Sequence, residues 1–419
     1  MRVLWFTNNP CNLQFEGRIN SYNAGGWMTA LQDEIMKCNE IELGICFIAN
    51  NLPSEIKQKG VTYFPVAAPH KKLIDKIKGY MFFRSLSVEE NLWNEYIIRF
   101  RNVINRFHPD IIQVFGSEKY MGLAAFSTSL PLVLHIQGVL NPCNDVYFPP
   151  GISVKDYYLQ DKNPRRIFKR YFDFLWWKRS CCREKHILSQ VNHYIGRTDW
   201  DKRVTYIFNP KAQYHFGEEI MRPSFYRPIE RRLPKQLTIT TTISAPYYKG
   251  YDLILKTANI LKNSLHLSFM WLVYGNVNPI FVEKVLGLRH KDLNIELKGV
   301  VDAEEIQKAH ASATVYVHSS YLENSCNSVI EAQMTGCPVV ANYVGGLTTI
   351  VKDGINGFLV PANDPYQTAY LIKYLYEHPE ENLSMGRHAA EDAFARHDKK
   401  KIVKSLLDTY NEIISASLK

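Results

Sequence analysis

The sequence has no apolar run close to the roughly 20 residues that a transmembrane helix needs. Its first residues, MRVLWFTN, are typical of a β-strand rather than a signal peptide, because a long apolar region and a small-residue cleavage site are both missing. The eight cysteines include the adjacent pair Cys181 and Cys182 but no C-x-x-C spacing, and they are too sparse for a disulfide scaffold. These absences predict a cytoplasmic protein and exclude a disulfide-stabilised secreted domain.

Metal-binding patterns are scarce as well. The one D-x-D triplet is Asp199-Trp200-Asp201. It stands at an expected helix start, where capping the helix is the simpler role for a carboxylate. With no better metal site in view, we expect neither a metal nor any other cofactor.

Positive charge is present in excess but unevenly distributed. Residues 1–230 contain 30 Lys and Arg against 22 Asp and Glu, whereas residues 231–419 contain 20 against 19. The excess is concentrated in residues 155–185, where 10 basic and 4 acidic residues alternate with aromatic ones. A basic, aromatic segment favours peripheral contact with an anionic membrane rather than nucleic acid. An internal helix with solvated basic side chains explains the segment equally well.

The length indicates two domains of about 200 residues each. Strand-like and helix-like segments alternate in both halves, which predicts an α/β protein with a parallel, doubly wound sheet in each half. The proline- and arginine-rich stretch at residues 221–233 marks the boundary. The expected strands include residues 2–7, 43–49, 61–65, 110–115, 132–136 and 191–196 in the first half, and 237–243, 269–274, 295–297, 313–318 and 339–341 in the second.

The most informative stretch is residues 321–361. A strand is followed by the polar turn ENSCNS (residues 323–328), by a helical run that Gly336 closes, and by the strand VVA. This is a β-α-β unit, in which ligands bind beyond the carboxyl ends of the strands. Glu323 and Glu331 lie about 12 Å apart along a helix axis, too far to share one proton or metal as a tight pair.

Between these two carboxylates lie the backbone amides of Ser325, Cys326 and Asn327, at the start of the expected helix. A helix N-terminus attracts anions. The spacing therefore fits one extended ligand, with a sugar at one carboxylate, a diphosphate at the amides and a ribose at the other carboxylate.

Glu323 and Glu331 resemble the E-x7-E motif of the retaining GT-B glycosyltransferases of family 4, the glycosyl transferases group 1. The segment EAQMTGCPVVANYVGG is similar to that family's EAMAxGxPVVAxxxGG. The resemblance implies two Rossmann-like domains facing across a cleft. Residues 1–225 would bind the acceptor and residues 226–399 the nucleotide sugar, while a helix at about 400–419 would return to the first domain. The motifs are specific only over residues 237–361.

The same resemblance implies the roles of the second-half residues. Glu331 would hold the ribose hydroxyls, and Glu323 would hold the donor sugar and orient its anomeric carbon. Lys249 and Gly250 resemble the K-G of the family's G-R-L-x-x-x-K-G, in which the lysine binds the donor diphosphate. Alone, such a lysine could be an ordinary surface residue at a helix start. The family's arginine is missing, because Ser244 takes its place in an ungapped match.

In the first half, Arg197 is a candidate for supplying the missing positive charge. His135, near the end of the strand at 132–136, matches a family histidine that contacts the donor sugar, although a lone strand histidine is more often a core residue. Gly25 and Gly26 precede a helix and match the loop near the diphosphate and acceptor. A plain hinge is the alternative for this pair.

We therefore expect a retaining, metal-independent hexosyltransferase. It would move a sugar from a nucleoside diphosphate sugar to a glycan or lipid-linked saccharide, in capsular, exo- or lipopolysaccharide biosynthesis of the bacterial surface type. We expect it in the cytoplasm. Whether it also makes peripheral contact with the inner face of the cell membrane is left open by the sequence. Two alternatives stay open: a non-catalytic, membrane-associated sugar-binding or assembly subunit, and another GT-B reaction such as sugar-nucleotide epimerisation.

Overall fold

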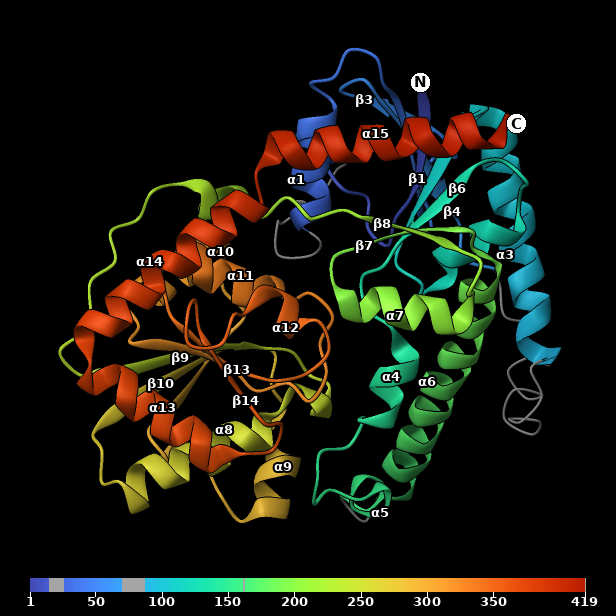
Figure 1. Ribbon diagram of the computed structural model, residues 1–419. Helices are drawn as coiled ribbons and strands as arrows, with labels where there is room; N and C mark the ends of the chain where they lie inside the picture. The colour runs from blue at the N-terminus through green and yellow to red at the C-terminus, as the bar shows by residue number, and fades with distance from the viewer. Residues whose placement is uncertain (15–25, 70–86, 161–162, 419) are drawn as a thin grey trace. The chain divides into compact units, whose positions relative to one another are not determined.

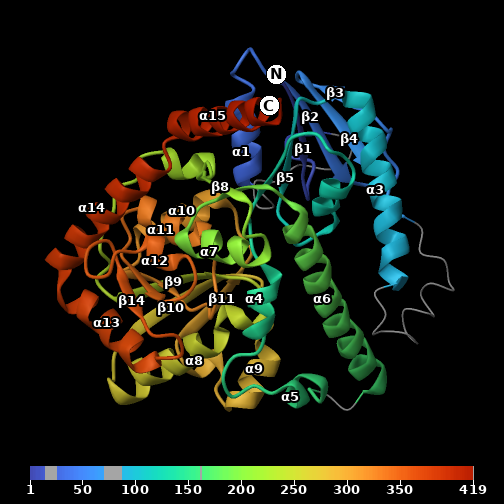
Figure 2. The same ribbon diagram turned by 45° about the vertical axis from the view of Figure 1, so that its right-hand side comes forward.

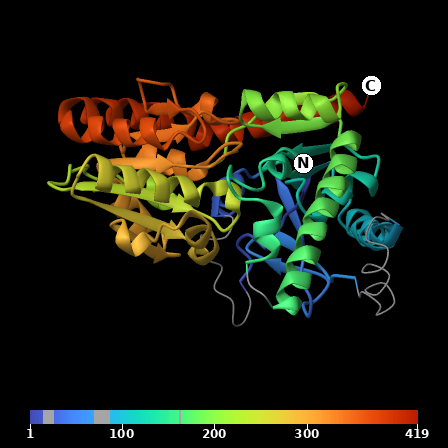
Figure 3. The same cartoon turned by 90° about the horizontal axis from the view of Figure 1, so that it is seen from below.

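The computed structural model describes residues 1–14, 26–69, 87–160 and 163–418. The chain divides into two compact units. The first contains Met1–Asn144, Phe168–Ile220 and Lys399–Lys419, and the second contains Asp145–Ile167 and Met221–Asp398. Both chain ends, marked in Figures 1 and 3, belong to the first unit.

The first unit is built on one eight-stranded sheet with the order β3-β4-β2-β1-β5-β6-β7-β8. All its neighbouring strands run parallel except β3, which pairs antiparallel with β4. The strand order reverses between β1 and β5, and ligands of such sheets bind at that edge. The strands are β1 (Arg2–Phe6), β2 (Glu42–Ile48), β3 (Ile56–Gln58), β4 (Val61–Val66), β5 (Ile111–Phe115), β6 (Leu132–His135), β7 (His193–Gly196) and β8 (Gln213–Phe216).

Helices cover this sheet and bury its almost wholly apolar central strands. Figure 2 shows α6 as one uninterrupted helix, and its buried residues begin only at Ser180. Helix α7 starts with a capping box in which the Asp201 carboxylate accepts from the Thr198 backbone, so the predicted capping role of this acidic segment is confirmed. The helices are α1 (Gly26–Ile35), α3 (Ser87–Phe107), α4 (Leu140–Asp145), α6 (Pro164–Gln190) and α7 (Asp199–Phe208). The short helix α5 (Val154–Tyr158) lies in the segment that groups with the second unit.

The C-terminal helix α15 (Lys399–Ser417) packs against α1 and is fixed by a buried chain of hydrogen bonds (Figure 1). Trp5 donates from Nε1 to the Tyr410 hydroxyl at 3.1 Å, and Tyr410 donates in turn to Oε1 of Gln113. Trp5 lies on β1 and Gln113 on β5. The last helix of the chain therefore secures the two strands between which the sheet order reverses.

The second unit has a six-stranded, wholly parallel sheet with the order β11-β10-β9-β12-β13-β14. Its order reverses between β9 and β12, so the expected ligand edge lies where these two strands end. The strands are β9 (Leu237–Ile243), β10 (Phe269–Gly275), β11 (Ile295–Gly299), β12 (Val315–His318), β13 (Val339–Asn342) and β14 (Phe358–Val360).

The helices of this unit pack on the sheet and on one another, with α11 against α14 and α8 against α13. The core gathers apolar residues of β12, α11 and β13. The helices are α8 (Tyr251–Asn259, continued by a π turn at Ile260–Ser264), α9 (Pro279–Leu286), α10 (Ala303–Ala311), α11 (Asn327–Met334), α12 (Leu347–Ile350), α13 (Pro365–Glu377) and α14 (Pro379–Arg396).

The predicted fold class is confirmed: two Rossmann-like α/β units, each with a doubly wound parallel sheet. The predicted strands agree with the observed ones within a few residues, and the basic, aromatic segment at 155–185 contributes most of α6, which runs on to Gln190. The predicted boundary after residue 225 needs one correction, because residues 145–167 group with the second unit. Their aromatic residues pack on a loop of that unit, a contact that no local pattern reveals.

The hydrogen-bond chain through α15 predicts the effect of removing one hydroxyl. Tyr410→Phe leaves the buried Trp5 indole N–H and the Gln113 side-chain oxygen without these partners, so we expect a loss of about 1–3 kcal/mol of stability. Urea unfolding followed by circular dichroism measures it. Tyr366→Phe removes a hydroxyl from a residue that is 72% exposed and serves as the matched control. Equal urea midpoints for the two variants would contradict the buried chain.

Candidate functional site

The loops that follow β9 and β12 meet at the edge where the second sheet reverses its order. Tyr321 donates its backbone N–H to the Tyr248 carbonyl at 2.7 Å, and the Ser319 hydroxyl donates to the Lys249 carbonyl at 3.0 Å. Gly250 has φ of +82°, and a Cβ there would lie 2.0 Å from the Ser319 carbonyl oxygen. Gly250 is thus a steric requirement, because only a glycine lets the loop that carries Lys249 approach the end of β12 this closely.

The side chain of Lys249 forms an ion pair with Glu323, and both are largely buried. Glu323 also accepts from the Ser320 hydroxyl at 2.9 Å and lies 3.3 Å from Nε2 of His318. Burial alone would raise the pKa of the Glu323 carboxyl, but Lys249 and His318 together lower it below its usual range. The carboxylate is therefore charged, fixed and surrounded by donors.

His318, the last residue of β12, was not predicted as a site residue. Burial acts to lower its pKa, but Cys326 and Glu323 raise the pKa to about 9, so the imidazole is protonated at neutral pH. Only 4% of the surface of His318 is exposed. The signal was visible in the sequence, since His318 ends the strand that precedes the E-x7-E motif, but no pattern separates it from a core histidine.

The Gly-Gly turn of the motif holds the backbone of the first acid. Gly346 donates its N–H to the Glu323 carbonyl at 3.0 Å. At Gly345, φ is +50° and a Cβ would lie 1.9 Å from the same carbonyl oxygen. Asn342, at the end of β13, donates to the carbonyls of Ser319 and Ser320 at 3.0 Å each. The strand, the turn and the acid therefore form one rigid unit.

Helix α11 starts beside this carboxylate. Cys326 is its N-cap residue and Asn327 its first helical residue, so the first-turn amides face outward at the positive end of the helix dipole. The buried Ser325 hydroxyl has no hydrogen-bond partner within the described ranges. Lys249, Glu323 and the helix start thus come together, as predicted.

The second acid of the motif has a partner that the sequence did not suggest. Arg222 forms a bidentate ion pair with Glu331, with both N–O distances at 2.7 Å. Burial raises the pKa of the Glu331 carboxyl, and Arg222 acts against that rise. Arg222 stands in the proline- and arginine-rich stretch that was interpreted only as a domain boundary. Any ribose contact of Glu331 must share the carboxylate with this guanidinium.

The structure describes both the residue at the position of the missing family arginine, Ser244, and the candidate for supplying its charge, Arg197. Ser244 is exposed in the loop after β9 and carries no charge. Arg197 belongs to the first unit, where it forms a buried ion pair with Glu219 at 2.6 Å. Its guanidinium is therefore already paired with a carboxylate. Within the described part of the second unit, His318 is the additional cation beside Lys249.

His135 lies at the end of β6 and is buried against Trp27 and Phe115. Burial, and then the charge of Arg197, hold its pKa well below the usual value, so the ring is neutral. Gln113 faces Nδ1 at 3.3 Å.

The polarity of the hydrogen-bond chain assigns the tautomer of His135. An indole can only donate, so Trp5 donates to Tyr410, Tyr410 to the Gln113 carbonyl oxygen, and the Gln113 amide to Nδ1. The ring proton therefore resides on Nε2, which finds no hydrogen-bond partner among the residues described. His135 is thus a hydrogen-bond donor in a fixed orientation, at the carboxyl end of an inner strand of the first sheet.

The predicted glycine pair is described only in part. Gly26 is the buried first residue of α1, and Gly25 lies outside the described residues. Nearby, Glu118 follows β5 and accepts from the Gly138 N–H at 2.7 Å. Burial raises the pKa of Glu118 to about 7. These groups gather at the ligand edge of the first sheet.

Residues 145–167 reach the lysine loop of the second unit. Tyr247, two positions before Lys249, stacks with Phe148 and accepts a hydrogen bond from Gln160 at 3.1 Å. Tyr157 contacts the same ring edge-on. This insertion therefore supports the loop that carries Lys249.

One group of side chains in the described residues could hold a metal ion: the donor atoms of His318, Glu323 and Cys326 all lie within 4.8 Å of one another. The Glu323 carboxylate is already paired with the Lys249 ammonium. His318 faces Glu323 with Nε2 and Cys326 with Nδ1. The arrangement is that of ion pairs, in which protonated side chains take the place of a cation.

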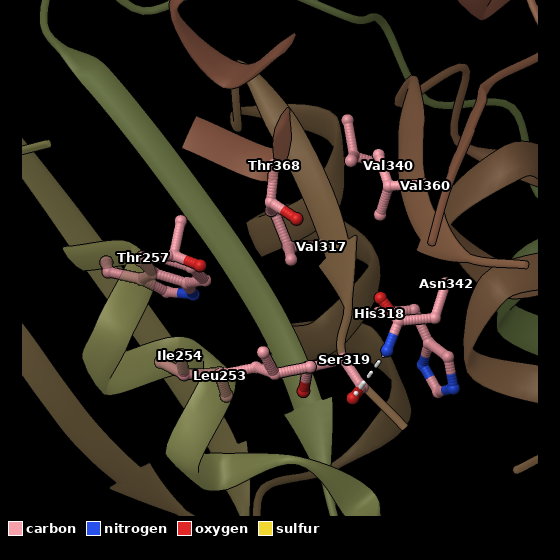
Figure 4. Close-up of a pocket in the computed structure, with 11 residues that line it drawn as sticks. Leu253, Ile254, Thr257, Val317, His318, Ser319, Val340, Asn342, Val360 and Thr368 are labelled. Atoms are coloured by element: carbon pink, nitrogen blue, oxygen red, sulfur yellow. Dashed lines mark hydrogen bonds between the residues drawn. The ribbon is translucent and has the colours of Figure 1, made fainter. Parts of the chain in front are cut away.

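Figure 4 shows a cavity directly behind this site, between α8 and the strands β12 and β13. Asn342 and Ser319 line it on one side and Thr257 and Thr368 on the other. Its volume of about 10 Å³ is near the limit for one water molecule. The cavity is therefore a packing defect beneath the site rather than a sugar pocket.

Comparison with known proteins finds a family similarity in the second unit. Residues 225–392 match the family described as glycosyl transferases group 1. The matched residues include Lys249, Glu323 and Glu331, three of the residues that carry the resemblance.

Curated proteins are similar to part of the chain. A D-inositol 3-phosphate glycosyltransferase of Streptomyces avermitilis is 37% identical over 154 residues, which is 35% of this chain and 33% of that protein. One from Paenarthrobacter aurescens is 30% identical over 177 residues, covering 41% and 42%. The chain thus spans less than half the length of the curated relatives it matches.

Solved structures resemble the whole chain at low identity. Sucrose-phosphate synthase from Thermosynechococcus elongatus has a TM-score of 0.71 at 16% identity, with 99% of both chains covered. Anabaena HepE in complex with UDP and glucose has a TM-score of 0.64 at 14% identity, covering 98% and 100%. WaaG, a glycosyltransferase involved in lipopolysaccharide biosynthesis, scores 0.60 at 13%, covering 97% and 99%. These likenesses show the GT-B fold.

The charge state of His318 predicts how stability depends on pH. Its pKa is about 9 in the folded chain, against roughly 6.5 for a free histidine. The contribution of this charge to stability is therefore complete below pH 6.5 and lost as the pH rises to 9, whereas the neighbouring Cys326 thiol, whose pKa is lowered, contributes with the opposite sign. The ring itself is the direct probe: we expect the His318 imidazole resonances in nuclear magnetic resonance spectra to titrate with a midpoint near pH 9, and the variant His318→Gln to identify them by their absence.

His310→Gln is the matched control in the same unit. His310 is fully buried and its pKa is lowered to about 3, chiefly by burial, so its contribution to stability is lost below pH 6.5 instead. Titration of the two rings between pH 5.5 and 9.5 distinguishes the two histidines, because the His310 ring should stay neutral over the whole range. A His318 ring that titrates at or below pH 6.5 would contradict the imidazolium assignment.

Proposed function

We propose that the chain is a retaining glycosyltransferase that uses a nucleoside diphosphate sugar as its donor. The observation that carries this proposal is the buried ion pair of Lys249 and Glu323 at the ligand edge of the second sheet, beside the N-terminus of α11. A cation, a set of helix-start amides and a fixed carboxylate suit a phosphate group next to a polyhydroxylated ring.

Each group has a role in the transfer. Lys249 and the amides of Ser325 to Asn327 stabilise the negative charge that develops on the leaving diphosphate. Glu323 holds hydroxyls of the donor sugar and so orients the anomeric carbon. Glu331, shared with Arg222, holds the ribose. No step requires a metal ion, because protonated side chains and amides neutralise the diphosphate.

Donor binding requires a change in the resting ion pair. In the structure Lys249 is bound to Glu323, whereas in the reaction it faces phosphate and the carboxylate faces sugar hydroxyls. His318 keeps Glu323 charged and paired during this exchange, since it contacts the same carboxylate oxygen at 3.3 Å. His318 therefore leaves the Glu323 carboxylate paired when Lys249 turns to the phosphate.

His135 extends the proposal to the first unit. Its ring is neutral, with the proton on Nε2, and it is positioned by Gln113 and Tyr410. A neutral imidazole N–H is a suitable donor to a sugar hydroxyl. By resemblance, that hydroxyl belongs to the donor sugar. Arg197, already paired with Glu219, is better suited to support this edge of the first sheet than to bind phosphate.

The choice of donor and acceptor to test follows from the names of the relatives. HepE was solved with UDP and with UDP-glucose, which makes UDP-hexoses the first donors to try. Acceptors named among the relatives include inositol phosphate, and WaaG acts in lipopolysaccharide biosynthesis. We favour a glycan or lipid-linked saccharide of the bacterial surface type, because of the basic, aromatic helix α6.

Helix α6 supports a membrane-facing acceptor. None of its aromatic side chains belongs to its buried residues, and Phe168 is 64% and Trp176 is 37% exposed. Across the described ranges, no helix has the length and hydropathy required to cross a bilayer. We therefore propose peripheral binding to the inner face of the cell membrane from the cytoplasm.

The enzymatic proposal is tested by nucleoside diphosphate release over a panel of sugar nucleotides, with EDTA present to exclude metal-dependent turnover. Glu323→Gln and Lys249→Ala should each lower turnover by about 100-fold or more, because each removes a charge at the reacting diphosphate or sugar. Lys298→Ala removes a pair with Glu296 elsewhere in the unit and should change nothing. Undiminished activity in either site variant would refute its role.

The membrane proposal is tested by co-sedimentation with vesicles that contain anionic lipid. We expect binding that weakens as salt rises, since surface charges are screened. Charge reversal at Lys169 and Lys178, both exposed on α6, should reduce binding several-fold. Charge reversal at Lys298 in the second unit should not. Binding that ignores salt, or that is equal in both variants, would reject this surface.

A further inference from the structure

The donor site contains a nucleophilic side chain that the proposed transfer does not use. The transfer needs the backbone amide of Cys326, but its thiol lies next to His318, with Sγ to Nδ1 at 3.7 Å. The other ring nitrogen of His318, Nε2, faces the Glu323 carboxylate at 3.3 Å. The order is thiol, imidazole, carboxylate, which is the geometry of an activated nucleophile: a base beside the nucleophile and an acid that orients the base.

Three features of the surroundings favour the charged form of this thiol. Cys326 is the N-cap residue of the eight-residue helix α11, at the positive end of its dipole. Its Sγ also lies 3.1 Å from the Ser328 hydroxyl. Beyond Glu323 stands the Lys249 ammonium, so the chain of contacts ends in a second cation. Tyr316 stacks on His318 at 6.3 Å and is the other titratable side chain facing the pair.

We propose that Cys326 is a thiolate paired with the His318 imidazolium, and that it is a modification site for small electrophiles of the hydroperoxide class. The electrostatics agree. Burial acts to raise the pKa of the Cys326 thiol, but His318 lowers it below its usual value. Cys337, which lies between α11 and β13 in the same β-α-β segment and is also buried, has its pKa raised instead.

The Cys326 thiolate and the His318 imidazolium supply the electron pair and the proton that the reaction with a hydroperoxide needs. The thiolate sulfur attacks one peroxide oxygen, the S–O bond forms and the O–O bond breaks. Sulfur is oxidised by two electrons to a sulfenic acid, and the peroxide is reduced. The hydroxide that leaves takes the proton of the His318 imidazolium and departs as water. The product places an oxygen atom at the N-terminus of α11 and removes the positive charge beside Glu323.

Modification would therefore close the donor site, a consequence that rests on the proposed function. The diphosphate is expected at the amides of Ser325 to Asn327, where the added oxygen would lie. A bound nucleoside diphosphate should in turn shield the thiolate. The reactivity of the thiol itself, however, depends only on the geometry of Cys326, His318 and Glu323.

The first test measures the ionisation of the thiol in the full chain. Reduced protein is alkylated with iodoacetamide between pH 5.5 and 9.5, and the rate at each cysteine is followed by peptide mass spectrometry. The pH midpoint of the rate reports the thiolate even where burial slows the reaction. We expect a midpoint for Cys326 at least about one unit below the roughly 8.5 of a free thiol. The exposed Cys182 is the internal control.

His318→Asn should raise the Cys326 midpoint and slow its alkylation about tenfold at pH 6.5. His310→Asn, which removes an equally buried histidine from the same unit, should leave the midpoint unchanged and so controls for loss of stability. A Cys326 midpoint at or above that of Cys182, or one unaffected by His318→Asn, would overturn the proposal.

The second test adds hydrogen peroxide and traps sulfenic acid with dimedone. Cys326 should be trapped several-fold faster than Cys182, and the fully buried Cys337 should not be trapped. Absence of the adduct at Cys326 would overturn the modification site. Added UDP should slow the trapping. A low midpoint without protection by UDP would instead contradict the proposed donor site while leaving the thiolate intact.

Discussion

The ion pair of Lys249 and Glu323 is the interaction on which the rest of the site depends. A buried carboxylate is costly unless cations and hydrogen-bond donors surround it, and here one ammonium, one imidazolium and one hydroxyl do so. Each partner comes from a different element, so the pair fixes the loop after β9 against the end of β12. The backbone is constrained as well. Gly250 and Gly345 lie so close to the carbonyl oxygens of Ser319 and Glu323 that a Cβ would not fit there.

The resting site is electrostatically satisfied without a ligand. Glu323 has Lys249 and His318, and Glu331 has Arg222 in a bidentate pair. A ligand that binds here must exchange with these internal partners. Under the proposed function, a diphosphate would do so at Lys249, because it offers more negative charge than one carboxylate, and selectivity for a doubly charged phosphate group over neutral sugars would follow from the exchange.

The first unit shows the same principle with hydrogen bonds in place of charges. The chain from Trp5 through Tyr410 and Gln113 to His135 has one possible direction, since it starts at a group that can only donate. The C-terminal helix thereby determines the tautomer of a histidine on β6. This explains in physical terms why the last helix of the chain belongs to the first unit.

Much of the fold could be predicted from the sequence. The alternation of strands and helices predicted two doubly wound sheets, and residues 313–346 predicted the strand, turn, helix and strand of the site within about two residues. Those signals are local, because periodicity, glycine positions and helix starts depend on neighbouring residues. The assignment of residues 145–167 to the first domain was wrong, since aromatic packing on Tyr247 connects segments about 90 positions apart.

The sequence by itself determined the class of fold, the position of the ligand edge in the second half and the identity of Lys249 and Glu323 as its charged groups. Only the tertiary structure decided the partners: Arg222 for Glu331, Glu219 for Arg197, and His318 and Cys326 beside Glu323. A sequence motif indicates which residues a site needs. The charge state of each residue, however, is set by burial and by groups distant in sequence, which come together only when the chain folds.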